Sequence, residues 1–208
     1  MAVHQKLFTI RCAKGQDFSA ENLFQLYIRA GMEVEIRNTL EKEGPGILDT
    51  KYTMLMKSQK INSFNENEYN CSLQLSPFHL AIFAQQEKSI QCILDYIIMH
   101  MKEEKDKIER LITLFKQKVL LEAMNDSQIS RDDQLVNGMN IFHLACQFYP
   151  ETLRIFQKTL FDELYRFSGS GSDKIAKERE LLAKAKTDFY GNTPLHIAAK
   201  KSLTNSAR

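Results

Sequence analysis

The chain has 208 residues, of which 43% are hydrophobic and 26% are charged, and its formal net charge is +2. Such a composition is ordinary for a globular protein, and a charge this close to neutral gives no general argument for binding nucleic acid or an anionic membrane. The sequence contains no run of about 18 apolar residues, so we predict no membrane span. Its first ten residues lack the long apolar core of a secretory signal.

Four cysteines, Cys12, Cys71, Cys92 and Cys146, are scattered along the chain without a C-x-x-C pair. Three of them lie among apolar or small residues on expected helices. We therefore predict reduced, packed thiols and a reducing compartment, the cytoplasm with the nucleus as a further possibility. A disulfide framework is the alternative interpretation.

Residues 1–40 are predicted to form a divergent first unit of two helices. Residues 7–13 favour a first helix. Ser19 is a suitable N-cap for a second helix, which Gly31 would close just beyond its C-terminus.

Residues 41–75 are predicted to be a long loop region. Gly44-Pro45-Gly46 breaks the helical pattern. A short helix is expected over residues 50–60, followed by a polar loop over 61–71. Connections of this length are commonly functional or disordered, so the region is either a finger that contacts a partner or a tolerated insertion.

Residues 76–136 begin with Ser76-Pro77-Phe78-His79-Leu80-Ala81, which predicts a capped helix to about residue 84. Apolar residues at helical spacing predict a second helix from 87 to about 101 and an inserted third helix that runs to about Met124. Lysines and arginines cover the outer face of the third helix. That basic stripe indicates a solvated face, with nucleic-acid or membrane binding as the alternative.

Residues 137–187 contain a second core, Asn140 to Cys146, with the same cap, His and Ala but no Pro. Pro150 is a suitable start for its partner helix. Residues 168–172, Ser-Gly-Ser-Gly-Ser, have the composition of a flexible linker, either native or engineered. Residues 173–186 are strongly helical in pattern.

Residues 188–208 begin a further unit. Asp188 and Gly191 supply turn chemistry, Thr193 is an N-cap, and Pro194 occupies the first helical position. Leu195 and residues 197–199 are expected to form the apolar face of this helix. The second helix of the unit would lie beyond Arg208, as in a fragment of a longer protein; a frayed, uncapped end is the alternative.

The three cores share one pattern of cap, apolar residue, His, apolar residue and Ala. Residues 193–199, Thr-Pro-Leu-His-Ile-Ala-Ala, closely resemble the ankyrin-repeat signature. The resemblance implies one all-α domain over residues 1–208, an ankyrin-like helical solenoid with inserted helices and long loops. The core histidines are 64 residues apart (79 to 143) and 53 apart (143 to 196), against a repeat period of about 33. We favour insertions over a repeat that has lost its signature.

The sequence lacks the motifs of common enzymes, namely a Gly-rich phosphate loop, His-Glu-x-x-His and Gly-x-Ser-x-Gly. The core histidines are expected to bond their own turns and backbone. Cys146 and His143 are three residues apart, but both are core positions of the motif. We therefore predict no catalysis, no cofactor and no metal site.

By resemblance, the function is protein–protein interaction, as an intracellular scaffold or adaptor that binds another protein through its concave face or its inserted loops. Two alternatives stay open: a regulatory or substrate-recruiting domain of a larger enzyme or ion channel, and a pathogen effector that mimics a host scaffold. The resemblance places the binding positions beside the core motifs, at Met139, Gln147, Phe148, Phe189, Tyr190, Asn192, Lys200 and Lys201, with Leu75 and Phe83 in the first core. The alternative for Phe83 and Phe148 is burial under the inserted helices.

Overall fold

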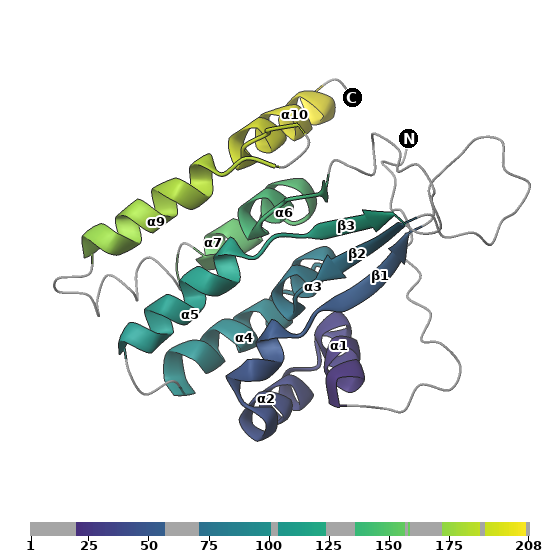
Figure 1. The fold of residues 1–208 in the computed structure, drawn as a ribbon, viewed down its shortest axis with the longest axis vertical. Coiled ribbons are helices and arrows are strands. Elements are labelled where there is room, and N and C mark those ends of the chain that lie inside the picture. Colours follow the sequence, from purple (N-terminus) through teal and green to yellow (C-terminus); the bar gives the residue numbers. More distant parts are fainter. Residues whose placement is uncertain are drawn as a thin grey trace, which may run out of the picture.

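A computed structural model describes residues 20–56, 71–100, 104–123, 136–156, 158, 172–187 and 190–206. This part of the chain is mostly helical, as predicted, and it also contains a small sheet of three strands. Figure 1 shows the helices in layers, from α1 and α2 at one end of the long axis to α10 at the other. The helix expected over residues 7–13 lies outside the described residues. Ser19, the expected cap of the next helix, lies outside them as well.

Two helical hairpins form the first layers of the stack. α1 (Ala20–Ala30) is followed by α2 (Glu33–Glu43), and α3 (Pro77–Phe83) is followed by α4 (Glu87–His100). Gly31 and Gln85 occupy the same place in the two turns, with positive φ values of 68° and 55°. In both turns the next N–H bonds to the carbonyl five residues back at 3.0 Å, Met32 to Tyr27 and Gln86 to Ala81. The two hairpins therefore end their first helices in the same way, although Gln85 replaces the usual glycine.

The shared turn aligns residues 54 positions apart, and the aligned core residues match. Four aligned pairs are fully buried in both hairpins: Phe24 and Phe78, Ile28 and Ile82, Ile36 and Ile90, Leu40 and Leu94. This equivalence explains why apolar residues recur at helical spacing in the first unit. At these four positions α1 carries the same residue type as α3, and α2 the same as α4.

In its described part, the region between the two hairpins is not a loop and helix as predicted; the polar loop predicted over residues 61–71 lies outside the described residues except for Cys71. A 3-10 helix, η1 (Pro45–Asp49), follows the break at Gly44, and its residues Ile47 and Leu48 are buried. The short helix expected over residues 50–60 is wrong, because strand β1 (Tyr52–Met56) occupies the start of that range. β1 pairs antiparallel with β2 (Cys71–Leu75), so that Tyr52 lies opposite Leu75.

The inserted helix is also shorter than predicted. α5 (Glu104–Lys116) ends eight residues before Met124, and β3 (Leu120–Ala123) pairs antiparallel with β2 to give the order β1-β2-β3. The apolar residues after Lys116 continued the helical spacing. They form a strand because the N–H groups and carbonyls of this segment find partners on β2 and at Met139.

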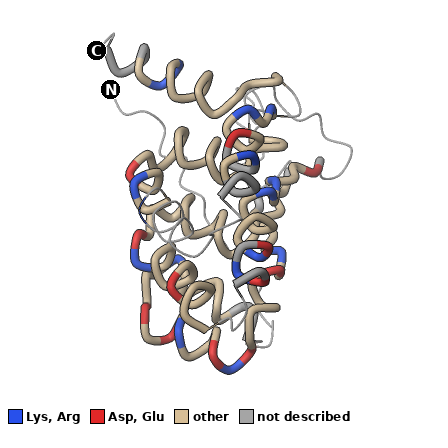
Figure 2. The backbone as a smooth tube through the Cα atoms, turned by 90° about the vertical axis from the view of Figure 1, so that its left-hand side faces the viewer, with Lys and Arg blue, Asp and Glu red and all other residues tan. Residues whose placement is uncertain are grey.

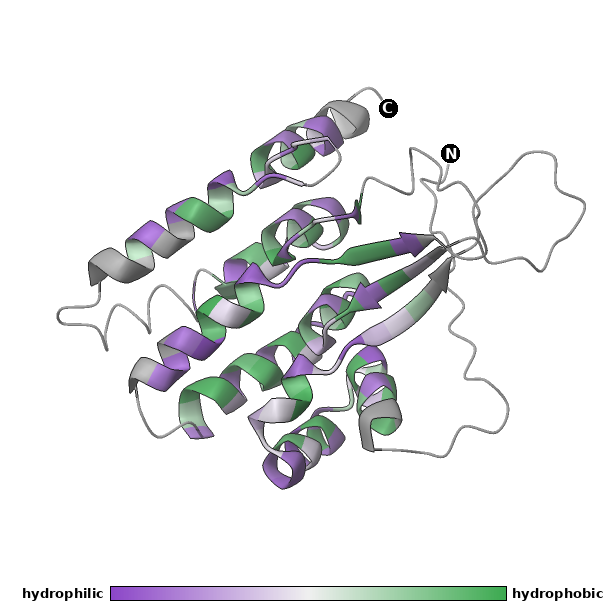
Figure 3. Cartoon of the chain, viewed as in Figure 1, coloured by the Kyte–Doolittle hydropathy of each residue, from purple (hydrophilic) through white to green (hydrophobic). Residues whose placement is uncertain are grey.

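Aromatic rings hold the inserted helix in the core. Phe115 of α5 lies 5.9 Å from Phe78 and 5.6 Å from Phe156, between ring centroids, and 6.2 Å from Phe142. These rings come from α3, α5, α6 (Ile141–Phe148) and α7 (Thr152–Phe156). Figure 3 shows that hydrophobic residues dominate α3, α4 and α6 in the middle of the stack. The insertion is therefore part of the core and not an appendage.

The last layer consists of α9 (Ser172–Lys184) and α10 (Pro194–Ser206). α9 covers most of the helix predicted over residues 173–186, whereas the linker residues 168–171 lie outside the described part. α10 begins at Pro194, as predicted. One expectation about it is wrong: Leu195 is 76% exposed, while Ile197 is only 6% exposed. Ile197 faces the body of the stack and Leu195, two residues earlier, points away from it.

Candidate interaction surface

Three loops, here called the tips, lead into α3, α6 and α10. In the second, Val119 donates to the carbonyl of Met139 and accepts from Gly138, both at 2.9 Å. In the third, Thr187 donates to the carbonyl of Asn192 at 2.9 Å and accepts from Gly191 at 3.2 Å. Gly138 and Gly191 have φ values of 74° and 63°, a conformation that favours glycine. The two tips have the same closing geometry.

The tips differ in the length of chain that they enclose. Three residues separate Thr187 from Gly191, whereas 18 separate Val119 from Gly138 (residues 120–137). The first tip is longer still, since its paired residues Tyr52 and Leu75 enclose residues 53–74. Part of the insertion predicted between His79 and His143 is thus located at the second tip, whereas the third tip, between His143 and His196, carries no insertion. The sheet forms where two long tips run side by side (Figure 1).

A histidine secures each helix start behind the tips. The backbone N–H groups of the caps Ser76, Asn140 and Thr193 donate to Nδ1 of His79, His143 and His196, at 3.3, 3.3 and 3.2 Å. Each cap side chain accepts in turn from the backbone N–H of its histidine, which completes a capping box. The predicted role of the core histidines, bonding turn and backbone, is therefore seen in all three units.

The other ring nitrogen joins two of the units to the next layer. Nε2 of His79 lies 3.2 Å from the carbonyl oxygen of Gln117, and Nε2 of His143 lies 3.0 Å from that of Asn192. A carbonyl only accepts, so Nε2 carries the proton in both rings. Within the described residues, Nε2 of His196 has no such partner.

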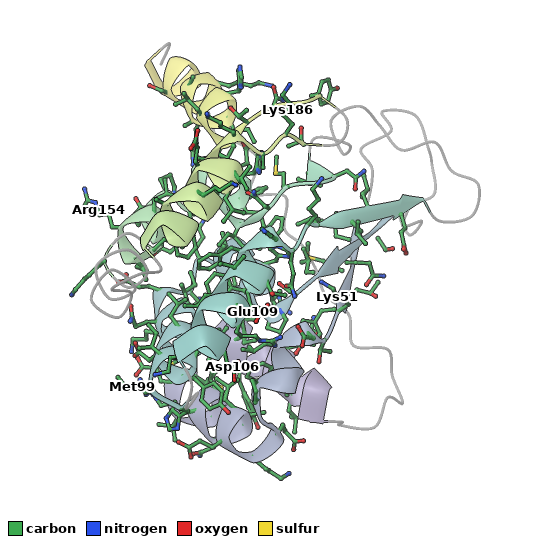
Figure 4. The ribbon with its side chains drawn as sticks, turned by 60° about the vertical axis from the view of Figure 1, so that its left-hand side comes forward. Lys51, Met99, Asp106, Glu109, Arg154 and Lys186 are labelled. Atoms are coloured by element: carbon green, nitrogen blue, oxygen red, sulfur yellow. The ribbon has the colours of Figure 1, made fainter. Side chains whose placement is uncertain are left out.

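Burial keeps these two rings neutral. Burial and, to a lesser extent, the positive charge of Lys51 lower the pKa of His79 to about 3, although the bond to the Gln117 carbonyl acts in the opposite direction. Burial also lowers the pKa of His143. Figure 4 shows Lys51 close to the strands. The histidines therefore act as structural donors at neutral pH.

A second row of contacts follows the C-terminal ends of α3, α6 and α10. The rings of Phe83 and Phe148 lie 4.5 Å apart, between centroids. Nε2 of Gln85 donates to the carbonyl of Phe148 at 3.1 Å, and Nζ of Lys201 donates to that of Gln147 at 3.0 Å. These bonds satisfy carbonyls at the end of α6 that have no partner within the helix.

The predicted binding residues fall into two groups, one at the tips and one in the second row of contacts. Tyr190 is 44% exposed at the third tip, where Asn192 is half-buried and uses its carbonyl to bond His143. The other row holds exposed Gln147 and Lys200, with Phe148 and Lys201 half-buried. Lys200 and Lys201 lie six and seven residues after Pro194, the first residue of α10, which is about 10 Å along the helix from the third tip. The predicted set is therefore two groups at opposite ends of the same helices.

Two predicted binding positions are wrong. Met139 is only 3% exposed and Leu75 is fully buried. Both stand directly before a cap residue, where the tip closes over the core, so their side chains fill the space beneath it. Phe189 lies outside the described residues. Phe83 and Phe148 are half-buried against each other. They are therefore neither fully exposed, as expected of binding positions, nor fully buried under the inserted helices.

Sequence reasoning missed a polar face on the sheet. Thr53, Gln74 and Glu122 form a ladder across the three strands, with Oγ1 of Thr53 donating to Gln74 at 3.3 Å and Nε2 of Gln74 donating to Glu122 at 3.5 Å. The other face carries buried Tyr52, Met54 and Leu73. The signal was the alternation of Leu73, Gln74 and Leu75, which is typical of a half-buried strand.

The arrangement around Cys146 does not resemble an activated thiol. Burial raises the pKa of Cys146, whereas an activated cysteine has a lowered pKa. Both ring nitrogens of His143 are engaged, by Asn140 and by Asn192. In the described ranges, no three His, Cys, Asp or Glu side chains lie close enough to hold a metal ion.

No protein-family model, curated protein or solved structure matches the chain. No helix in the described ranges combines the length and the apolar character needed to cross a membrane.

Proposed function

We propose that this chain is a protein-binding module, an ankyrin-like scaffold or adaptor without catalysis of its own. The observation that carries the proposal is the repeated geometry of three units. Each has a capped helix, a histidine at the same place and a tip in front of it, and two of the histidines bond to the next layer. Such a scaffold holds a row of surface side chains in fixed positions, which lowers the entropy lost when a partner binds.

The side chains in this row suit a protein partner. Tyr190 is exposed at the third tip, and Gln147 and Lys200 are exposed at the other end of the helices. The half-buried rings of Phe83 and Phe148 pack against each other at the C-terminal ends of α3 and α6. Aromatic residues held rigidly beside polar ones are typical of binding hot spots.

The free, buried cysteines support a reducing compartment for this module. Cys92 and Cys146 are unpaired, and burial raises the pKa of both thiols. Structural thiols of this kind are common in intracellular proteins. The proposed location is therefore the cytoplasm or the nucleus.

The test compares the exposed residues predicted to bind a partner, Gln147, Tyr190 and Lys200, with the first tip. One variant combines Gln147→Ala, Tyr190→Ala and Lys200→Ala, which changes exposed side chains only. A second replaces residues 57–70 by Asn-Gly, because Met56 and Cys71 are already paired and two residues of this type close a hairpin. Met99→Ala, at an exposed position on α4, is the matched control.

Each variant is used to capture partners from cell lysate, after circular dichroism has confirmed its helical content. The proposal predicts that the triple variant loses at least one partner that the control retains, by about 1–3 kcal/mol for each true hot spot. If the triple variant keeps every partner and the shortened tip loses them, the insertions carry the binding. If both keep every partner, neither surface is the binding site.

A further inference from the structure

Two turns between paired helices lie side by side in the stack. The first joins α3 to α4, and the second joins α6 to α7. Nε2 of Gln85 in the first turn donates to the carbonyl of Phe148 in the second at 3.1 Å, and the rings of Phe83 and Phe148 lie 4.5 Å apart, between centroids. Phe83, Phe148 and Tyr149 are each half-buried, so the two turns together present partly exposed aromatic rings to solvent.

Each of these turns ends in an acidic residue. Glu87 and Glu151 lie eight residues after the histidines of their units, His79 and His143, and both are exposed. Glu87 is the first residue of α4 and Glu151 directly precedes α7, positions where a negative charge favours the start of a helix. Within the described residues, neither carboxylate forms an ion pair. The two turns therefore carry two unpaired negative charges beside their aromatic rings.

The first layer shows how a carboxylate in this position is paired. The equivalent of Glu87 there is Glu33, 54 residues earlier, and Nζ of Lys88 from the next layer lies 3.3 Å from its carboxylate. The residue 64 positions after Lys88, at the same place in the layer above Glu87, is Thr152, which is uncharged and fully buried. Glu87 therefore has no lysine of this kind from its own chain, and Lys88 is directed to the first layer.

Both carboxylates act on the same aromatic side chain. Burial raises the pKa of Tyr149, and the negative charges of Glu87 and Glu151 add to that rise. A charge has such an effect only when it lies near the group that titrates. The surface around the Tyr149 ring therefore favours a cation, which an aromatic face also attracts.

The next layer supplies positive charge on the other side of α6. α10 contains Lys200 and Lys201 and no acidic residue, and Figure 2 shows blue without red on this helix. Nζ of Lys201 donates to the carbonyl of Gln147 at 3.0 Å, so this ammonium group is held at the end of α6. The unpaired negative charge therefore belongs to the α3–α4 and α6–α7 layers and not to that of α10.

We infer that an arginine side chain of a protein partner binds between the two turns, with its guanidinium on the Tyr149 ring and its N–H groups directed to Glu87 and Glu151. A guanidinium is planar, so it can lie on an aromatic ring while its edges donate to carboxylates. Its alkyl stem packs on the apolar rings of Phe83 and Phe148. The inference rests on the proposed function, because it names the class of partner that the module binds, a segment that presents arginine.

The experiment titrates the ¹⁵N-labelled chain with the peptide acetyl-Gly-Arg-Gly-amide at constant ionic strength, up to about 10 mM, where NMR detects a millimolar Kd. Two further peptides carry citrulline or lysine in place of the arginine. Citrulline has the shape of arginine without its charge, and lysine has the charge without the planar fork. The variants Glu87→Gln and Glu151→Gln each remove one carboxylate. Glu109→Gln, at an exposed position on α5 that Figure 4 labels, is the matched control.

The arginine peptide should shift the amide signals of residues 83–87 and 147–152 until they saturate. The citrulline peptide should leave them unchanged, and the lysine peptide should bind more weakly. Glu87→Gln and Glu151→Gln should each weaken the binding of arginine about two- to fivefold, the range of an exposed ion pair, whereas Glu109→Gln should not change it. All three side chains are exposed, and the spectrum of each variant without peptide verifies its fold.

Three outcomes overturn the inference. The first is the absence of saturable shifts at the two turns. The second is equal binding of the citrulline or the lysine peptide. The third is an equal loss in Glu109→Gln, which would indicate a general effect of charge. The proposed function stands in each case if the triple variant at Gln147, Tyr190 and Lys200 still loses a partner, because that variant leaves the carboxylates and Tyr149 unchanged.

Discussion

Nε2 of His143 donates a hydrogen bond to the backbone carbonyl of Asn192 at 3.0 Å, across 49 residues of sequence. The same histidine accepts the backbone N–H of Asn140, the cap of its own helix. One buried, neutral ring therefore fixes a helix start and connects it to the next layer of the stack. The stability of the protein should depend on that ring staying neutral.

The first prediction concerns pH. The folded-state pKa values of His79 and His143 are lowered, whereas an unfolded histidine has a pKa near 6.5. Below about pH 6.5 the unfolded chain binds more protons, so stability is full above that pH and is lost as the pH falls towards 3. The loss between pH 6.5 and 5 should be about 2 kcal/mol for His79. His143 should add a loss in the same direction.

Urea unfolding at pH 7 and pH 5 measures this loss. His143→Gln removes one titrating group and should reduce the difference between the two pH values, although the variant is less stable at both. The control is His196→Gln, which changes an exposed ring. Equal pH dependence in the wild type and in His143→Gln would assign the effect to other groups.

The second prediction separates two neighbouring apolar residues of α10. Ile197→Asp should destabilise the protein by several kcal/mol, because an unpaired carboxylate would be buried at a position that is 6% exposed. Leu195→Asp should change the free energy of unfolding by less than about 0.5 kcal/mol, because the side chain is 76% exposed. Thermal or urea unfolding of the dilute chain distinguishes them. Comparable losses in both variants would contradict the orientation of α10.

The third prediction compares two helix caps. Asn140 is 3% exposed, accepts from the N–H groups of Phe142 and His143, and donates to the carbonyl of Leu182. Asn140→Ala should therefore cost about 2 kcal/mol or more, since it removes the cap and leaves buried groups without partners.

Thr193, the cap of α10, is half-buried. Water can therefore reach the backbone N–H groups that lose their partner when this side chain is removed. Thr193→Ala should cost about 1 kcal/mol. Urea unfolding gives both values. A larger cost at Thr193 than at Asn140 would show that burial does not set the strength of these caps.

The fourth prediction concerns the contact between α5 and η1. Arg110 donates to both carboxylate oxygens of Asp49, at 2.9 and 2.8 Å, and to the carbonyl of Pro45 at 2.6 Å. The Arg110 side chain is only 15% exposed. Asp49→Asn should cost about 1 kcal/mol, because the charged contact of one guanidinium nitrogen, Nη1 of the largely buried Arg110, with the half-exposed carboxylate is lost.

Glu43→Gln is the matched control, because Glu43 pairs with a Lys42 side chain that is 79% exposed. Pairs of this kind contribute about 0–1 kcal/mol. If chemical denaturation gives equal costs for Asp49→Asn and Glu43→Gln, the contact does not hold the inserted helix α5 to η1.

The sequence by itself determined the helix starts of the three motif-bearing units. A capping residue and the histidine three positions later act within one turn of chain, so Ser76, Asn140 and Thr193 could be read without knowledge of the fold. The apolar spacing of α4 and the break at Gly44 are local in the same way. The bounds of α4 were predicted within one or two residues, whereas α2 itself was not predicted and only its end at Gly44 was.

Only the tertiary structure determined that a sheet forms and which apolar residues near the tips are buried. Leu120 and Leu121 fit a helical pattern, and they form a strand because β2 supplies backbone partners from nearly 50 residues away. Met139 resembled an exposed anchor and is buried because the tip closes over it. Leu195 and Ile197 are equally apolar in sequence. Which of them is buried depends on the side from which α6 packs against α10, and no local pattern contains that information.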